Sequence, residues 1–131
     1  MTGLDTNVLV RFLVEDDADQ TARAARSIER CAGSGDALYV SDVVVCEVVW
    51  VMQSAYEIAK PEIIRVVGTL LKARQLAFQD ADLLVRALAR FARGKGDFAD
   101  YVIAERARTA GCLRVATFDR ALLKEAGFVQ P

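Results

Sequence analysis

The hydrophobic residues of the chain fall into short apolar runs that alternate with longer amphipathic stretches. The runs at residues 1–4, 37–40, 76–78 and 113–117 have the length of strands, and residues 128–129 add a candidate edge strand. Between them, apolar positions spaced three and four residues apart predict helices. The predicted helices cover residues 6–14, 17–32, 42–57, 61–72, 80–93, 97–110 and 119–126.

Residues 43–52 form the ambiguous stretch, because their valines would also suit a strand. Ser41 or Asp42 can cap a helix there, and the segment continues to about Tyr56, which is long for a strand. We therefore expect a buried helix. The spacing of Asp17 and Gln20 is typical of a capping box and marks the start of the preceding helix.

Helices of these lengths between strands predict right-handed β-α-β crossovers and a parallel sheet. Sheets of this kind bind ligands at the carboxyl ends of their strands. Functional side chains are therefore expected directly after each strand.

The 131 residues suit a single domain, residues 1–131, and 53% of them are hydrophobic, which excludes a disordered chain. No apolar run approaches the ~18 residues that a membrane span needs. The N-terminus lacks the basic segment of a signal peptide. We therefore expect a soluble, cytoplasmic protein.

The chain has no histidine, and its three cysteines (Cys31, Cys46 and Cys112) lack C-x-x-C spacing. These features exclude Ser-His-Asp and Cys-His catalysis, and they argue against a disulfide framework or a zinc site. A bound metal would need oxygen ligands, which points to Mg²⁺, Mn²⁺ or Ca²⁺. The net charge of −1 argues against a polycation that coats nucleic acid.

Two aspartates directly follow predicted strands. Asp5 ends the first strand and Asp119 ends the strand at residues 113–117. Each could serve only as a helix cap, which is a common role for aspartate at such a position. Each could also present its carboxylate at the ligand-binding edge of the sheet.

Glu47 lies inside the valine-rich predicted helix, with large apolar residues on both sides in the sequence. We expect its carboxylate to be shielded from water, and a buried charge is costly unless it is protonated, paired or bound to a metal. A salt bridge to one of the arginines is the alternative to a ligand role.

Asp97 and Asp100 open a predicted helix and, three residues apart, share one face of its first turn. One could cap the helix while the other favours its dipole. Because Asp100 precedes the apolar residues 101–104, we expect it to tilt inward and Asp97 to lie further out.

Two strand ends and two helical positions can converge at one edge of a parallel sheet. Several carboxylates within a few Å cannot all stay ionised without a cation. Hard divalent ions prefer such oxygen-only surroundings, and phosphodiester hydrolysis is the reaction that they serve best.

Four segments resemble the acidic motifs of the PIN domain, and more closely those of VapC-type toxins of bacterial toxin–antitoxin pairs. Residues 3–10 resemble the first motif, Glu47 in its valine-rich helix the second, residues 97–104 the third and residues 115–120 the fourth. The resemblance covers the whole chain in order. It implies a three-layer α/β/α domain whose central parallel sheet has four to five strands.

The resemblance also implies roles for individual residues. Asp5, Glu47, Asp100 and Asp119 would be catalytic, metal-binding carboxylates, and Asp97 an accessory ligand that could exchange roles with Asp100. By the same resemblance, Thr117 would be the hydroxyl beside the metal and Asn7 the structural amide that follows the first aspartate.

The function implied by the resemblance is that of an endoribonuclease that uses Mg²⁺ or Mn²⁺ and blocks translation. Its expected partners are its RNA substrate, a second copy of itself and a small VapB-like antitoxin. The high hydrophobic content leaves room for a partner surface on helices 42–57 and 61–72, although a well-filled core explains that content equally well. The alternatives are an RNA-processing PIN nuclease without antitoxin and a non-catalytic module that only binds a structural cation.

A basic stripe formed by Arg86, Arg90 and Arg93 leads into Lys95, just ahead of the acidic pair. These side chains are candidate contacts for RNA phosphates, although a solvated helix face explains them as well. The chain's 13 arginines against 4 lysines fit phosphate binding. A GC-rich genome would produce the same bias.

Overall fold

The computed structural model describes the backbone of residues 1–131 and every side chain except that of Ala32. Its contacts divide the chain into two compact units, Met1–Ala81 and Asp82–Pro131. Each unit has its own sheet and its own buried apolar residues.

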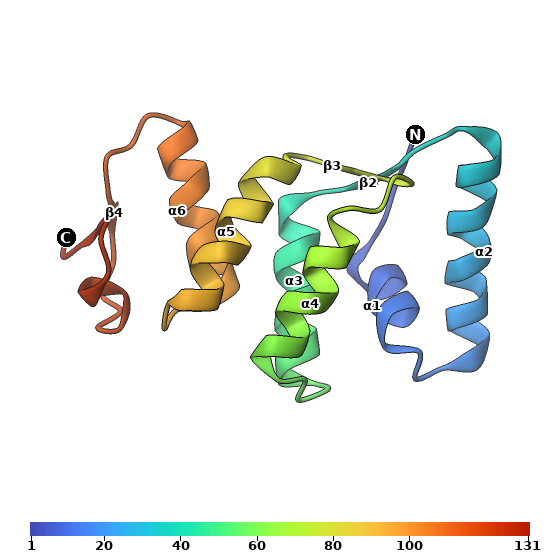
Figure 1. The fold of residues 1–131 in the computed structure, drawn as a ribbon, viewed down its shortest axis with the longest axis horizontal. Helices are drawn as coiled ribbons and strands as arrows, with labels where there is room; N and C mark the ends of the chain where they lie inside the picture. The colour runs from blue at the N-terminus through green and yellow to red at the C-terminus, as the bar shows by residue number, and fades with distance from the viewer. The chain divides into compact units, whose positions relative to one another are not determined.

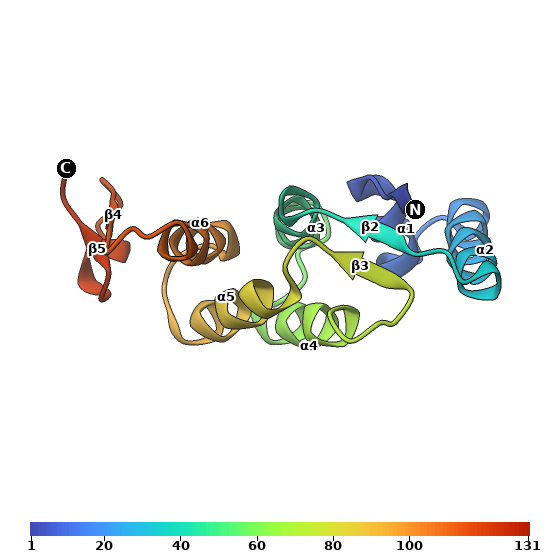
Figure 2. The same cartoon turned by 90° about the horizontal axis from the view of Figure 1, so that it is seen from above.

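The N-terminal unit contains a three-stranded parallel sheet (Figure 1). The middle strand is β2, and Figure 2 shows it next to β3. Leu38 of β2 lies opposite Thr2 of β1 and Leu76 of β3. The elements are, in chain order, β1 (Thr2–Gly3), α1 (Thr6–Val14), α2 (Ala18–Ser34), β2 (Leu38–Val40), α3 (Asp42–Ser54), α4 (Lys60–Leu70) and β3 (Leu76–Phe78).

The helices of this unit begin where the sequence provides caps. The Asp17 carboxylate accepts a hydrogen bond from the Gln20 amide at 3.0 Å, at the start of α2. The Ser41 hydroxyl accepts one from the Val44 amide at 3.3 Å, at the start of α3. The ambiguous valine-rich segment is therefore a helix, and the apolar residues on its inner face are buried: Val45, Val48, Val49 and Met52.

Helix α1 packs against both α2 and α3, and α3 packs against α4. A polar network joins α1 to the loop after α3. Arg11 donates to both Asp16 oxygens, at 2.7 and 2.9 Å, and the Tyr56 hydroxyl donates to Asp16 at 2.7 Å. The hydrogen bonds from Tyr56 and then Arg11 hold the pKa of the Asp16 carboxyl below its usual range. The start of the chain is thus anchored to the helix that carries Glu47.

The C-terminal unit packs two helices with a two-stranded parallel sheet, in which Val115 lies opposite Phe128. Phe91 and Phe98 meet edge to face with ring centroids 5.9 Å apart, and both are buried. The elements are α5 (Ala81–Arg93), α6 (Phe98–Thr109), β4 (Val115–Ala116), the 3₁₀ helix η1 (Leu122–Lys124) and β5 (Phe128–Val129).

Two sequence predictions are corrected here. The helix expected over residues 119–126 is only the short η1, because Glu125 already has an extended backbone and Gly127 has a positive φ of 91°. The strand expected over residues 113–117 is only β4. The resemblance implied one central sheet of four to five parallel strands, whereas the described residues form two parallel sheets, of three and two strands. Among the described helices, none is long and apolar enough to cross a membrane.

Candidate active site

Asp5 directly follows β1 and occupies the N-cap position of α1. Its backbone carbonyl accepts a hydrogen bond from the Val8 amide at 3.2 Å, but its side chain makes no capping hydrogen bond. The Asp5 carboxylate is therefore exposed and not hydrogen-bonded to the amides of α1. Helix capping does not account for an aspartate at this position.

Glu47 lies next to the start of α1, because the Thr6 hydroxyl donates a hydrogen bond to its Oε2 atom at 2.7 Å. Thr6 itself is buried. No arginine or lysine among the described residues lies within ion-pair distance of Glu47. The salt-bridge alternative is thus not supported, and the hydroxyl of Thr6 holds the carboxylate instead.

The expectation that Glu47 is shielded from water is wrong within the N-terminal unit, where its side chain is exposed. Its apolar neighbours divide between two faces of α3. The inner face contributes to the core, whereas Val43 and Trp50 are 65% and 68% exposed on the same side as Glu47. Burial raises the pKa of the neighbouring Cys46 thiol to about 11, so it is not a thiolate at neutral pH.

Asp97 and Asp100 lie at the N-terminus of α6 in the C-terminal unit. The Asp97 amide donates to Asp100 Oδ2 at 2.8 Å. Asp97 is exposed and Asp100 half-buried, which confirms their predicted order. Burial raises the pKa of the Asp100 carboxyl, and the nearby carboxylates of Asp97, Asp119 and Glu125 raise it further.

Asp119 follows β4, as expected, and it does cap a turn. Its Oδ1 atom accepts hydrogen bonds from the amides of Ala121 and Leu122 at 2.8 and 3.3 Å. Its own amide donates to the Thr117 hydroxyl at 3.1 Å, so Thr117 shapes the turn. The capping role of Asp119 is therefore confirmed for its Oδ1 atom, whereas its Oδ2 atom is left to bind a cation.

Glu125, which the sequence analysis did not select, secures the loop before α6. Its carboxylate accepts hydrogen bonds from the Tyr101 hydroxyl at 2.8 and 3.0 Å, and from the Lys95 amide at 3.3 Å. The Tyr101 hydroxyl in turn accepts from the Gly96 amide at 2.9 Å. A tyrosine hydroxyl on an apolar helix face needs a hydrogen-bond partner, so Tyr101 was the sequence feature that could have pointed to a residue such as Glu125.

The candidate ligands are divided between the units, with Asp5 and Glu47 in the first and Asp97, Asp100 and Asp119 in the second. Within the residues that the structure describes, no group of three or more potential ligands has the geometry of a metal site. The donors themselves fit a hard divalent cation. They are carboxylates without basic partners, and those of the C-terminal unit repel one another.

The predicted basic stripe divides into two kinds of residue. Arg86 and Arg90 contact the buried carboxylate of Glu105, at 3.1 and 3.5 Å, and Arg108 adds a third ion pair at 3.5 Å. Glu105 is only 4% exposed, so among the described residues it is the glutamate that is both buried and paired with arginines. Arg90 also lies over the rings of Tyr101 and Phe128.

Arg93 and Lys95 are the exposed members of the predicted stripe. They line an open hollow of about 320 Å³ together with Lys124 and Glu125. Neither side chain has an ion-pair partner among the described residues. They stay candidates for phosphate contacts, whereas Arg86 and Arg90 are held by the fold.

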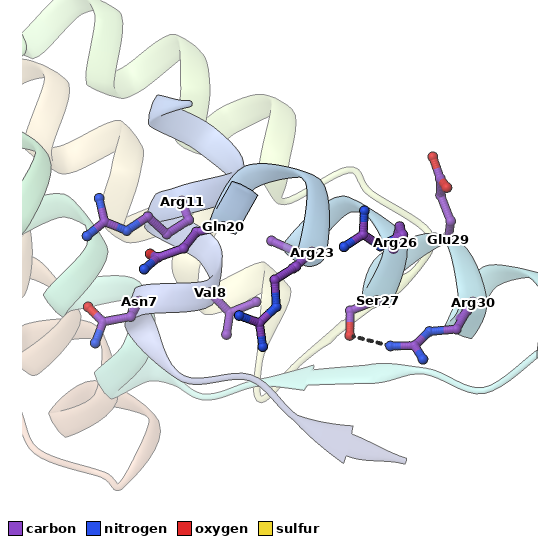
Figure 3. A pocket seen from close by; sticks show the side chains of 10 residues that line it. Asn7, Val8, Arg11, Gln20, Arg23, Arg26, Ser27, Glu29 and Arg30 are labelled. Atoms are coloured by element: carbon purple, nitrogen blue, oxygen red, sulfur yellow. Dashed lines mark hydrogen bonds between the residues drawn. The ribbon is translucent and has the colours of Figure 1, made fainter. Parts of the chain in front are cut away.

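Asn7 is exposed on α1 and lines an open cleft between α1 and α2 (Figure 3). The figure shows its amide beside Arg11 and Gln20 and pointing away from the helix. The structural role expected from the resemblance stays a prediction for this residue.

Comparison with known proteins places these residues in a family context. The PIN domain family model matches residues 4–129, which include all the candidate ligands. A VapC ribonuclease of Aquifex aeolicus (strain VF5) is 26% identical over 128 residues, which cover 98% of this chain and 93% of that protein. The PIN domain is a three-layer α/β/α fold, which confirms the predicted fold class.

Proposed function

The chain belongs to the PIN-domain family, and we propose that it is an endoribonuclease that hydrolyses RNA phosphodiesters with Mg²⁺ or Mn²⁺. The observation that carries the proposal is the crowding of Asp97, Asp100 and Asp119 around the start of α6. Mutual repulsion there helps to raise the pKa of Asp100. A divalent cation would relieve that repulsion.

In this proposal the principal metal ligands are Asp5, Glu47, Asp100 and Asp119, and Asp97 is an accessory ligand. A bound cation supplies a water of lowered pKa and stabilises negative charge on the phosphate oxygens. Thr6 would orient Glu47 through its 2.7 Å hydrogen bond. The assignment of ligands from both units to the same cation comes from the sequence resemblance.

Other residues would position the ligands and the substrate. The Thr117 hydroxyl accepts from the Asp119 amide and so fixes the turn that presents that carboxylate. Glu125 and Tyr101 hold the loop at residues 94–96 and thereby the start of α6. Arg93, the last residue of α5, and Lys95, on the loop that follows it, are both exposed and would contact RNA phosphates.

The test is cleavage of RNA by the purified protein with Mg²⁺ or Mn²⁺ and with EDTA. We expect cleavage only with the metal, and we expect Glu47→Gln to abolish it while the circular dichroism spectrum stays unchanged. Glu57→Gln is the matched control, because Glu57 is an exposed glutamate of the same unit without a role in the proposal. Full activity in EDTA, or in a folded Glu47→Gln variant, would refute the metal mechanism.

The likeness to a VapC ribonuclease supports a toxin that acts on translation, a homodimer and a VapB-like antitoxin. Exposed Val43 and Trp50 on α3 are suited to a partner surface. Light scattering of the purified protein tests the dimer. Co-purification with the product of a short neighbouring gene tests the antitoxin. RNA cleavage without any such gene would favour the RNA-processing alternative.

A further inference from the structure

An open cleft of about 840 Å³ lies between α1 and α2, wholly within the N-terminal unit. Four of the side chains that line it are arginines: Arg11 from α1, and Arg23, Arg26 and Arg30 from α2. Among the described lining residues, Glu29 is the single acid. The cleft is therefore strongly basic in a protein whose net charge is −1.

The three arginines of α2 form a row along one side of the cleft. Their spacing of three and four residues places them on one helix face, and the row is about 10 Å long at the rise of an α-helix. Figure 3 shows Asn7 at one end of the row and Arg30 at the other. A row of this length can meet more than one phosphate of an extended strand.

These arginines are free to bind a ligand, because the fold scarcely uses their charge. Arg23 lies 4.0 Å from Asp19, and both of those side chains are at least 70% exposed. Arg30 donates a long hydrogen bond of 3.5 Å to the Ser27 hydroxyl. Arg26 is exposed and has no ion pair among the described residues. Arg11, by contrast, is held by Asp16.

One end of the cleft is lined by a residue that is close in sequence to the candidate catalytic residues. Asn7, which lines one end of it, is two residues after Asp5 and adjacent to Thr6, the donor to Glu47. A strand lying along α2 would therefore lead toward the carboxylates of the same unit.

We propose that the cleft binds the phosphates of the single-stranded RNA that the enzyme cuts, an inference that rests on the proposed function. Arginine suits phosphate oxygens because its planar fork forms two hydrogen bonds at once. The amides of Asn7 and Gln20 and the hydroxyl of Ser27 also line the cleft, and such groups suit ribose hydroxyls.

A protein helix is a poorer occupant of this cleft. A helix in a groove needs apolar pockets for anchors spaced by three and four residues. The described apolar lining side chains are only Val8 and Ala24. Charge complementarity therefore favours a nucleic acid over a peptide.

The experiment measures binding of a labelled single-stranded RNA at several salt concentrations, in the Glu47→Gln background so that the RNA stays intact. The triple variant Arg23→Gln, Arg26→Gln, Arg30→Gln is expected to bind at least about tenfold more weakly near 0.1 M salt. The slope of log affinity against log salt should fall by about 2, since each lost single-strand phosphate contact contributes about 0.7.

The matched control removes the same charge elsewhere, through Arg65→Gln, Arg74→Gln and Arg114→Gln. It should keep most of the affinity and the slope. Arg26→Gln alone, which removes no ion pair, should lower the slope by about 0.7. This single variant keeps the test valid if the triple variant does not fold.

The outcomes separate the inference from the proposed function. If the parent protein cuts RNA and the triple variant binds RNA with unchanged affinity and slope, only the cleft assignment is overturned. It is also overturned if RNA binding is unchanged while binding of an acidic partner protein is lost. If the parent neither binds nor cuts RNA, both are overturned.

Discussion

The Thr6 hydroxyl donates a 2.7 Å hydrogen bond to Glu47 across 41 residues of sequence. Thr6 is the first residue of α1 and directly follows Asp5, while Glu47 lies in the middle of α3. This contact therefore ties the residue next to Asp5 directly to Glu47. Because Thr6 is buried, its hydroxyl has a defined direction.

Replacement of this hydroxyl should weaken metal binding more than it weakens the fold. We expect Thr6→Val to raise the Kd for Mn²⁺ by about 10- to 100-fold, the usual effect of losing a residue that orients a ligand. The free energy of unfolding in EDTA should fall by only about 1 kcal/mol. Calorimetric titration and thermal melting measure the two effects.

Thr69→Val is the control for the Thr6 variant. The Thr69 hydroxyl bonds the Arg65 carbonyl of its own helix, exposed and without a proposed ligand nearby. Its Mn²⁺ affinity should match that of the parent. Equal Mn²⁺ affinities for Thr6→Val and the parent would exclude Thr6 as a positioning residue.

The loop before α6 admits no side chain at residue 94. A Cβ added to Gly94 would lie 1.8 Å from the Tyr101 hydroxyl oxygen and 2.7 Å from Glu125 Oε1. Tyr101 is completely buried and cannot move aside. We expect Gly94→Ala to lower the free energy of unfolding by about 1–3 kcal/mol, as overpacking does.

Gly33→Ala provides the contrast, measured by the same chemical denaturation. An added Cβ at Gly33 meets nothing within 4 Å, and this glycine is in the last turn of α2. Alanine should leave the stability unchanged or raise it by up to about 1 kcal/mol. A Gly94→Ala protein as stable as Gly33→Ala would show that the Tyr101–Glu125 contact is not maintained in solution.

Local rules predicted the helices well, because caps and apolar spacing are written in neighbouring residues. The Asp17 cap of α2 and the buried valines of α3 both follow from such rules. The predicted places of Asp5 and Asp119, shortly after β1 and β4, are confirmed. Their convergence on one site stays a prediction, because β1 and β4 belong to different sheets. The short η1 was missed, because Glu125 is drawn into a contact with Tyr101, 24 residues away.

Burial of charge could not be predicted from sequence neighbours. Glu47 has apolar neighbours on both sides in the chain yet is exposed, because those neighbours divide between two faces of α3. Glu105 was not selected, yet it is buried and paired with arginines from two helices. Which carboxylate is enclosed depends on the tertiary partner of its helix face, and periodicity within one helix does not reveal that partner.

The buried Glu105 makes a prediction for the basic stripe on α5. Without the Glu105 carboxylate, Arg86 and Arg90 lose their ion-pair partner and the hydrogen-bond acceptor between α5 and α6 is gone. We expect Glu105→Ala to lower the free energy of unfolding by about 2 kcal/mol or more. Arg86→Gln should also lower stability, with RNA affinity nearly unchanged.

Arg93→Gln is the comparison for Arg86→Gln, since Arg93 is exposed and has no ion pair among the described residues. It should leave the melting temperature unchanged and weaken RNA binding, with a salt slope reduced by about 0.7. The reverse pattern, with Arg86 important for RNA and Arg93 for stability, would contradict the division of the stripe.

Asp100 makes the sharpest prediction about the metal, because its ionised form is disfavoured in the folded protein. Burial and the neighbouring carboxylates raise its pKa, so its ionisation costs stability as the pH rises above the ordinary value. We expect Asp100→Asn to melt at a higher temperature than the parent in EDTA at pH 7. The difference should shrink as the pH falls below the ordinary aspartate pKa of about 3.9, because the carboxyl is then protonated in both the folded and the unfolded protein.

Saturating Mn²⁺ should reverse this order, because binding stabilises the parent by an amount that grows with ligand concentration over Kd. Asp100→Asn keeps an oxygen for the hydrogen bond from the Asp97 amide but loses the charged ligand. The control Asp82→Asn removes an exposed charge near the start of α5 and should respond to Mn²⁺ as the parent does. If Asp100→Asn gains as much stability from Mn²⁺ as the parent, Asp100 is not a ligand. If Asp100→Asn melts at a lower temperature than the parent in EDTA, the ionised Asp100 carboxylate does not destabilise the folded protein, and repulsion from Asp97 and Asp119 is excluded as a cost to stability.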